Sequence, residues 1–410
     1  MGAICNIARS TAGEAMKKYP CLLIATDFPP NGSGGGAAIV RQMLRDWPTD
    51  RLHWWSCQPD LDPRFGQKVS SHSIAHIPGK LNPARRFLNL KSWLIECAWA
   101  PYASRQLEAT IRRVKPDCIW VVPHVWSIPP IINVVPKTGI GFHVSMHDYA
   151  DANCNSQEPW ALRRRGLAEK ADSLFSLATT RDAICQPMLD DLFARTGKTG
   201  LILRAGLESL DFEFIANLSP RPKHEIRIAY AGTILVEEDF EFFVKALDLV
   251  RRRSLLPITL EFFGAHSYAT RIWFAPSWMK EHGNLSSQVL ADSLKNFTWG
   301  FCPMSLTDHN PRYNRYSLPT KFSSYLAAGL PVISMGHIES SIVKMTRAYA
   351  VGLCLINHEL EPTADELEAA LSDLTPLQRY HSEIERCARE QFDAVKFRRQ
   401  LEAQFRTCAS

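Results

Sequence analysis

The chain has 410 residues, of which 46% are hydrophobic and 22% are charged, and its formal net charge is +5. A single hydrophobic core stops growing near ~250 to 300 residues, so this length predicts two domains of roughly 200 residues each. The composition is typical of a soluble globular protein and excludes a disordered or coiled-coil chain. The mild charge does not indicate nucleic acid as a partner.

Two further features bear on location. No apolar run reaches the ~20 residues of a membrane helix, and the first residues lack the apolar core of a signal peptide, so we expect a cytoplasmic protein. The 11 cysteines include no CxxC pair, and they predict neither a disulfide framework nor a zinc site.

A stretch rich in cations and aromatic rings runs from Arg85 to Arg113 and contains Trp93, Trp99 and Tyr102. It is compatible with a surface helix that packs its tryptophans inward. It is also compatible with peripheral contact between the protein and an anionic membrane, because basic amphipathic helices bind lipid head groups. Both interpretations stay open at this stage.

The first half of the chain alternates strand-like and helical segments. Its short apolar runs, typical of buried parallel strands, lie at 19–26, 53–56, 117–122, 141–146, 173–179 and 201–203. A helix is expected at 37–46. This alternation indicates a doubly wound α/β sheet.

The pattern starts again after the polar stretch 217–225 (NLSPRPKHE), which is the best linker candidate. The second half has expected strands at 226–231, 259–263, 298–303 and 331–334, with helices at 240–253 and 321–328. We therefore predict an α/β protein with two Rossmann-like domains facing a central cleft. The predicted domains are residues 1–216 and 226–390, followed by a C-terminal helix at 391–410 that could pack back on the N-terminal domain.

A glycine-rich loop, 29–37 (PPNGSGGGA), follows the first strand and precedes a helix. Gly32 and Gly34 begin a GxGxxG/A match, but two prolines and an asparagine delay the turn that a dinucleotide fingerprint makes directly off the strand. The loop favours backbone amides that approach a ligand at a helix N-terminus, with Gly34, Gly35 and Gly36 as candidates, over nicotinamide or flavin binding. A flexible turn without a ligand is the competing interpretation.

The most informative stretch is 317–334 (SLPTKFSSYLAAGLPVIS). Pro319 suits the first turn of a helix, Lys321 lies just inside its positive end, and Gly329 can close it before the next strand. A nucleotide diphosphate would find a helix dipole and a cation there. We expect Lys321 to bind such a diphosphate, and a solvated surface lysine is the alternative.

Other candidate residues for binding the diphosphate surround this helix. They are Ser324 and Tyr325, which share the Lys321 face at helical spacing; Arg312, Arg315 and Tyr316 in the preceding loop; and Gly232 and Thr233 in the turn after the 226–231 strand.

The stretch 317–334 resembles the PSKxxEYLAAGxPVI block of GT-B glycosyltransferases, notably family 4. Further segments are similar to that family's motifs in the same order: DFPPNGSGGGA, SMHDY, ADSLFSLAT, LRAGLE and IAYAGTI. The resemblance implies the GT-B fold and transfer of a sugar from a nucleoside diphosphate donor, UDP by default. The acceptor would be a hydroxyl of a glycan or a lipid-linked molecule in polysaccharide or glycoconjugate assembly. No metal and no cofactor besides the donor are implied.

The sequence departs from the retaining members of that family, whose paired glutamates fall here on Tyr316 and Ser324. The chain is more similar to the inverting glucuronosyltransferase type of bacterial polysaccharide assembly, which relies on a lysine in this helix. Inversion needs one base on the acceptor hydroxyl, for which Asp148 is the first candidate and His147 the second. A helix-capping aspartate and a core histidine are the competing interpretations. The anomeric outcome stays open.

Three other functions are compatible with these features. The missing glutamates fit a transferase-like binding protein without catalysis. A UDP-sugar 2-epimerase or a carbohydrate phosphorylase shares the fold. A dehydrogenase would use the glycine loop and need an acidic residue such as Asp60 to hold a ribose.

Overall fold

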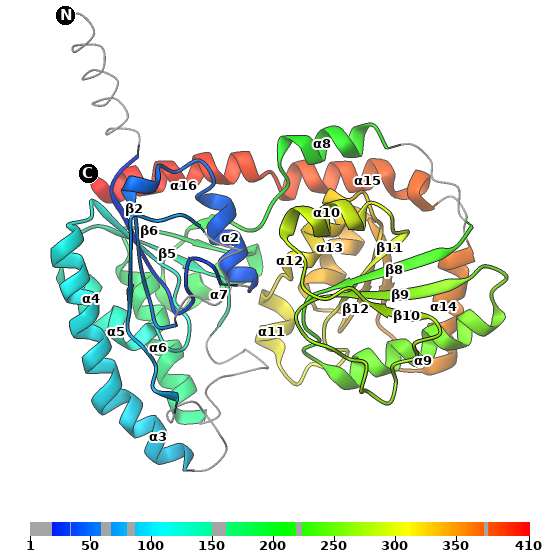
Figure 1. Cartoon of the computed structure of the whole chain (residues 1–410), viewed down its shortest axis with the longest axis horizontal. Coiled ribbons are helices and arrows are strands. Elements are labelled where there is room, and N and C mark those ends of the chain that lie inside the picture. Colours follow the sequence, from blue (N-terminus) through cyan, green and yellow to red (C-terminus); the bar gives the residue numbers. More distant parts are fainter. Residues whose placement is uncertain are drawn as a thin grey trace, which may run out of the picture. The chain divides into compact units, whose positions relative to one another are not determined.

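The computed structural model describes residues 19–32, 34–58, 67–79, 87–149, 161–218, 224–372 and 376–410. The chain divides into two compact units (Figure 1). Unit 1 comprises Met1–Arg204 and Lys396–Ser410, and unit 2 comprises Ala205–Val395. Asp60, Arg85 and most of the expected linker lie outside the described residues.

Unit 1 is built on a seven-stranded parallel sheet in the order β3-β2-β1-β4-β5-β6-β7. The strands are β1 (Leu22–Ala25), β2 (Leu52–Ser56), β3 (Ser71–Ile74), β4 (Cys118–Val121), β5 (Phe142–Met146), β6 (Thr180–Ala183) and β7 (Leu201–Ile202). The strand order reverses between β1 and β4, and doubly wound sheets bind ligands beyond the strand carboxyl ends at such a point.

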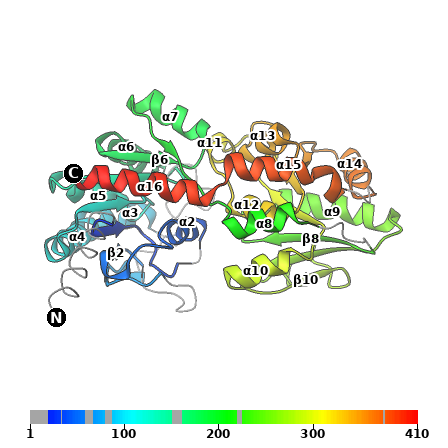
Figure 2. The ribbon, with the colours of Figure 1, turned by 90° about the horizontal axis from the view of Figure 1, so that it is seen from above.

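The helices of unit 1 are α2 (Gly35–Met43), α3 (Leu88–Leu94), α4 (Ala100–Val114), α5 (Ile128–Val134), α6 (Ala161–Leu177), α7 (Gln186–Thr196) and α16 (Ala394–Ala409), which belongs to this unit from Lys396 onward. A π-helical turn, Ile95–Trp99, joins α3 to α4. Helix α16 lies over the sheet, where the Phe405 ring contacts Trp120 and His143 (Figures 1 and 2).

One predicted strand of this unit is wrong. In the apolar run at 173–179, residues 173–177 form the end of α6, and the strand β6 starts only at Thr180. The buried residues of the run, Leu174, Phe175 and Ala178, follow helical spacing. A short apolar run fits a buried helix end as well as a strand, because periodicity does not separate the two at this length.

Unit 2 is built on a six-stranded parallel sheet in the order β10-β9-β8-β11-β12-β13. The strands are β8 (Ile226–Ala231), β9 (Ile258–Phe263), β10 (Met279–Glu281), β11 (Trp299–Pro303), β12 (Val332–Met335) and β13 (Gly352–Leu355). The reversal here lies between β8 and β11. A cluster of buried aromatic rings that includes Tyr230, Phe240 and Phe301 packs on this sheet.

The helices of unit 2 are α8 (Ser209–Ala216), α9 (Glu237–Arg253), α10 (Ser287–Leu294), α11 (Pro311–Tyr316), α12 (Thr320–Ala327), α13 (Ser341–Tyr349), α14 (Leu360–Ser372) and α15 (Pro376–Gln391). Helices α9 and α14 pack side by side, and α8 and α15 both contact α12 (Figures 1 and 2). In the described part of the chain, no helix is long and apolar enough to cross a membrane.

Candidate functional site

Lys321 is the second residue of α12, whose N-cap is Pro319. Its side chain is half-buried, and the ammonium Nζ lies 4.1 Å from the centroid of the Tyr230 ring at the carboxyl end of β8. Burial lowers the pKa of Lys321 to about 8. The lysine thus keeps a cation next to the free amides of a helix N-terminus, an arrangement that suits an anion.

The turn after β8 comes close to this ammonium. Gly232 has a φ of 108°, which favours glycine, and a Cβ added to it would lie 3.6 Å from the Lys321 Nζ. The Gly232 amide donates to the Phe263 carbonyl at 2.7 Å, and the Tyr230 hydroxyl donates to the Thr233 carbonyl at 2.7 Å. The structure therefore brings three of the expected donor-side residues, Gly232, Thr233 and Lys321, to one sheet edge.

The prediction that Tyr325 shares a ligand-binding face of α12 with Lys321 is wrong. The Tyr325 side chain is fully buried, and its hydroxyl accepts from the Ala231 amide at 2.9 Å and donates to the Phe301 carbonyl at 3.0 Å. The ring packs on Gly300, where no Cβ would fit. The tyrosine thus ties α12 to strands β8 and β11, and its hydroxyl is engaged by backbone groups of both strands. The Ser324 hydroxyl is half-buried and donates to the Thr320 carbonyl at 3.3 Å.

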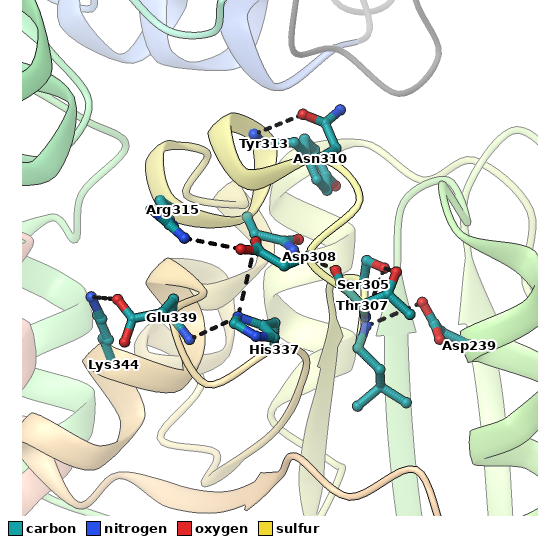
Figure 3. Close-up of polar contacts among 12 residues, drawn as sticks. Asp239, Ser305, Thr307, Asp308, Asn310, Tyr313, Arg315, His337, Glu339 and Lys344 are labelled. Carbon is teal, nitrogen blue, oxygen red and sulfur yellow. Dashed lines mark hydrogen bonds and ion pairs between the residues drawn. The ribbon is translucent and has the colours of Figure 1, made fainter.

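The loop after β11 and helix α11 hold the other donor-side candidates, of which Figure 3 shows Arg315. Arg315 pairs with the Asp308 carboxylate at 2.9 Å, and the same carboxylate lies 4.0 Å from the His337 ring after β12. Asp239 accepts from the Leu306 amide at 3.2 Å. Arg315 therefore organises the loop through Asp308, a contact that local sequence did not indicate.

Two more candidates share this short helix. Arg312 and Tyr316 are both half-buried on α11, whose first turn is capped by the Asn310 side chain through the Tyr313 amide at 3.2 Å. In the chain, this helix follows β11 and precedes α12.

In unit 1, the predicted base His147 follows β5 and is 3% exposed. Neither ring nitrogen has a hydrogen-bond partner among the residues that the structure describes. A Cβ added to Gly36, in the first turn of α2, would lie 3.3 Å from its Nδ1. Burial, with a smaller effect of His124, lowers the pKa of His147 to about 3, so the ring is neutral. Such a buried, uncommitted imidazole beside a glycine-rich helix start points to a ligand.

Asp148, the other predicted base, is half-buried and follows His147 directly. Cys185 is the N-cap residue of α7. Burial raises the pKa of its thiol to about 11, and the charge of Asp148 makes a small contribution in the same direction.

Sequence reasoning missed a histidine–aspartate pair at the same edge of the sheet. His124, after β4, places its Nδ1 3.3 Å from the Oδ1 of Asp27, which follows β1. Burial raises the pKa of Asp27, whereas the charge of His124 opposes that shift. The His124 side chain keeps 21% of its surface exposed, and its ring lies 6.5 Å from that of His147. His124 and Asp27 each follow an apolar strand by two or three residues. That position at the end of a strand is the sequence signal from which the pair could have been predicted.

The glycine loop faces this group of residues. Gly34 is the N-cap of α2, Gly35 begins the helix, and Gly36 lies against His124 and His147. A side chain at position 36 would crowd both rings. The amides of the loop, two imidazoles and one carboxylate thus gather where the strand order of unit 1 reverses.

Comparisons with known proteins fit this architecture. Residues 247–390 match the family "glucosyltransferase 3-like, C-terminal domain". No curated protein matches the chain. Among solved structures, sucrose-phosphate synthase from Thermosynechococcus elongatus is 13% identical and has a TM-score of 0.67, with 95% of this chain and 98% of that one covered.

Two further structures agree. An α,α-trehalose 6-phosphate synthase from Burkholderia multivorans is 12% identical, with a TM-score of 0.63 over 95% of this chain and 98% of that one. HepE from Anabaena, in complex with UDP-glucose, is 11% identical, with a TM-score of 0.62 over 93% and 98%. The chain has the GT-B fold. The predicted α/β class with two Rossmann-like sheets is confirmed.

Proposed function

We propose that this GT-B chain is a glycosyltransferase that moves a sugar from a nucleoside diphosphate donor, with UDP favoured, to a hydroxyl of a glycan or lipid-linked acceptor. The observation that carries the proposal is the position of Lys321, which lies 4.1 Å from the Tyr230 ring and beside the Gly232 turn at the start of α12. Helix amides and one ammonium there can stabilise the charge that develops on a leaving diphosphate.

The similarity of residues 247–390 to a glucosyltransferase 3-like domain supports a hexosyl donor, glucosyl first, over a glucuronosyl donor. HepE was solved with UDP and with UDP-glucose, which supports UDP as the nucleotide. Assembly of a polysaccharide or glycoconjugate is the proposed setting. We propose no metal for this chemistry, because a helix N-terminus and Lys321 can offset the phosphate charge.

The acceptor hydroxyl needs a base, and unit 1 offers three candidates. Asp148 and His147 follow β5, and His124 follows β4 with Asp27 at 3.3 Å. Of these, we favour His124, because its side chain keeps 21% of its surface exposed and its Nδ1 lies 3.3 Å from the Asp27 carboxylate, which can stabilise a protonated ring. The proton of the acceptor hydroxyl would pass to the His124 Nε2 while the acceptor oxygen forms a bond to the anomeric carbon of the donor sugar. The bond from that carbon to the diphosphate breaks, and its electron pair leaves with the nucleotide.

A lipid-linked acceptor fits the surface of α3 and α4. Phe87, Leu90, Trp93 and Tyr102 are 65%, 55%, 58% and 44% exposed, whereas Trp99 is buried and donates to the His76 carbonyl. We propose that the exposed aromatic and aliphatic side chains touch an anionic membrane at its inner face. Trp99 thus packs inward, and we propose Trp93 for the membrane contact.

The test is product analysis by mass spectrometry after incubation with a panel of UDP-sugars and with lipid-linked glycan or sugar-phosphate acceptors. A product heavier than an acceptor by one sugar residue supports the proposal. A second candidate, a binding protein without catalysis, is favoured by Tyr316 and Ser324 in place of a glutamate pair. Calorimetry that shows UDP binding without any product in the whole panel would favour this second candidate.

A further inference from the structure

The sheet face under α16 carries an unusual set of polar side chains. Gly141 precedes β5, and a Cβ added to it would meet the backbone of Cys408 in α16, with the Cys408 Cα at 3.0 Å. The helix can approach this closely only because the residue is glycine. The last turn of α16 is thus held against the sheet at one defined point.

A chain of buried hydrogen bonds leads from the sheet to that turn. The Trp120 indole donates to Ser145 at 2.8 Å, and Ser145 donates to the Asp182 carboxylate at 2.8 Å. His143 contacts the same carboxylate at 2.6 Å through Nε2. Its Nδ1 contacts the Thr180 hydroxyl at 2.8 Å, and this hydroxyl lies 2.9 Å from the Cys408 sulfur. The Cys408 thiol therefore ends a polar chain inside an apolar core.

A second thiol lies at the same point. Strand β4 pairs with β5 in the register Ile119 with Phe142, which places Cys118 opposite Gly141. Paired residues of neighbouring strands project to the same face of a sheet, so the Cys118 side chain faces α16 beside Cys408. The Gly141 contact thus brings the last turn of α16 to the strand position next to Cys118. The influence of Cys118 lowers the pKa of Cys408 to about 7, whereas burial raises the pKa of Cys118.

We propose that Cys408 and Cys118 are an oxidisable pair, which hydrogen peroxide converts into a disulfide between the last turn of α16 and strand β4. The Cys408 thiolate attacks the peroxide, the O–O bond breaks, and a sulfenic acid and hydroxide result. The Cys118 sulfur then displaces the sulfenic oxygen and loses its proton, and water leaves. In total, two thiols are oxidised and one peroxide is reduced to two waters.

The roles of the two cysteines follow from their surroundings. Cys408 is 6% exposed and Cys118 is fully buried, so Cys408 is the sulfur that a small oxidant reaches first. The thiolate is the reactive form of cysteine, and the Thr180 hydroxyl and His143 can stabilise it. Helix α16 carries the chain back to unit 1 after unit 2, and the disulfide would anchor that returning helix covalently.

The experiment treats the full-length protein with hydrogen peroxide, blocks free thiols, and maps peptides by mass spectrometry without reduction. We expect a linked peptide pair that contains Cys118 and Cys408, that is about 2 Da lighter than the sum of its parts, and that dithiothreitol separates. Cys97→Ser should keep this link, because Cys97 is exposed and belongs to another helical segment.

Cys118→Ser should abolish the link and leave Cys408 as a sulfinic or sulfonic acid. The oxidised wild type should also melt at a higher temperature than the reduced protein, and the oxidised variant should not. The mapping of the wild type decides the matter even where a variant fails to fold. Over-oxidised Cys408 without a link in the wild type, or links that involve only other cysteines, would overturn the proposal.

Discussion

At the scale of single residues, Lys321 carries the donor side of the proposal. Replacement of Lys321 by Ala removes the ammonium at the start of α12, and we expect UDP affinity to fall by about 10- to 150-fold, or ~1.5 to 3 kcal/mol. The melting temperature without ligand should change little, because a half-buried cation near an aromatic ring adds little net stability. Titration calorimetry measures the effect. Lys245→Ala, an exposed lysine paired with Glu241 on α9, is the matched control. Equal UDP affinity in wild type and Lys321→Ala would remove the central residue of the site.

The pH dependence of donor binding tests the same residue independently. Because burial lowers the pKa of Lys321 to about 8, the free protein loses the ammonium as the pH rises through that value. UDP affinity should therefore fall between about pH 7.5 and 9.5, with the loss on the alkaline side. Lys321→Arg keeps its charge throughout this range and should flatten the profile. A profile that falls equally steeply in Lys321→Arg would assign the titration to another group.

His124 and Asp27 are the residues on which the acceptor chemistry rests. His124→Ala should reduce turnover by ~10² to 10⁴ and leave UDP affinity unchanged, as expected of a lost general base. Asp27→Asn should cost less, because it removes only the charge beside the ring and keeps the imidazole itself. His76→Ala, an exposed histidine of the same unit, is the control. If Asp148→Asn instead abolishes turnover and His124→Ala is active, Asp148 is the base.

At the scale of elements, the segment from α3 to α4 carries one exposed tryptophan, Trp93, and one buried tryptophan, Trp99. Trp93→Ala should weaken sedimentation with anionic vesicles in a salt-sensitive way and leave the melting temperature nearly unchanged, because Trp93 is exposed. Trp99→Ala should lower the melting temperature strongly, since removal of a buried tryptophan costs ~3 to 5 kcal/mol. Leu255→Ala, a fully exposed apolar residue of unit 2, is the control. Unchanged vesicle binding in folded Trp93→Ala protein would exclude this segment as the membrane contact.

At the scale of the whole molecule, donor binding should stabilise the native chain without a metal. Excess UDP should raise the melting temperature, because a ligand that binds only the folded state shifts the unfolding equilibrium. Treatment with EDTA should leave that rise intact, since Lys321 and the start of α12 offset the diphosphate charge. Differential scanning fluorimetry with and without EDTA measures both effects. A rise that EDTA abolishes and manganese restores would show that a metal is required.

The sequence alone determined the features that depend on local pattern. Alternating apolar runs and helices predicted two Rossmann-like sheets, because strand and helix periodicities act over a few residues. The helix start at Pro319 and the cation at Lys321 were predictable for the same reason, since a cap and the first turn are adjacent in sequence. Segment 173–179 shows the limit of such patterns, because a short apolar run does not distinguish a helix end from a strand.

Only the tertiary structure decided which distant residues meet. Asp27 and His124 become neighbours because β1 and β4 pair in parallel, and Cys118 meets Cys408 because α16 returns to the sheet of unit 1. The Tyr325 side chain is buried, and its hydroxyl accepts a hydrogen bond from the Ala231 amide of β8. Helical spacing by itself does not predict this contact. Strand order and register are set by packing across the whole chain, so these contacts have no signature at any fixed spacing along the sequence.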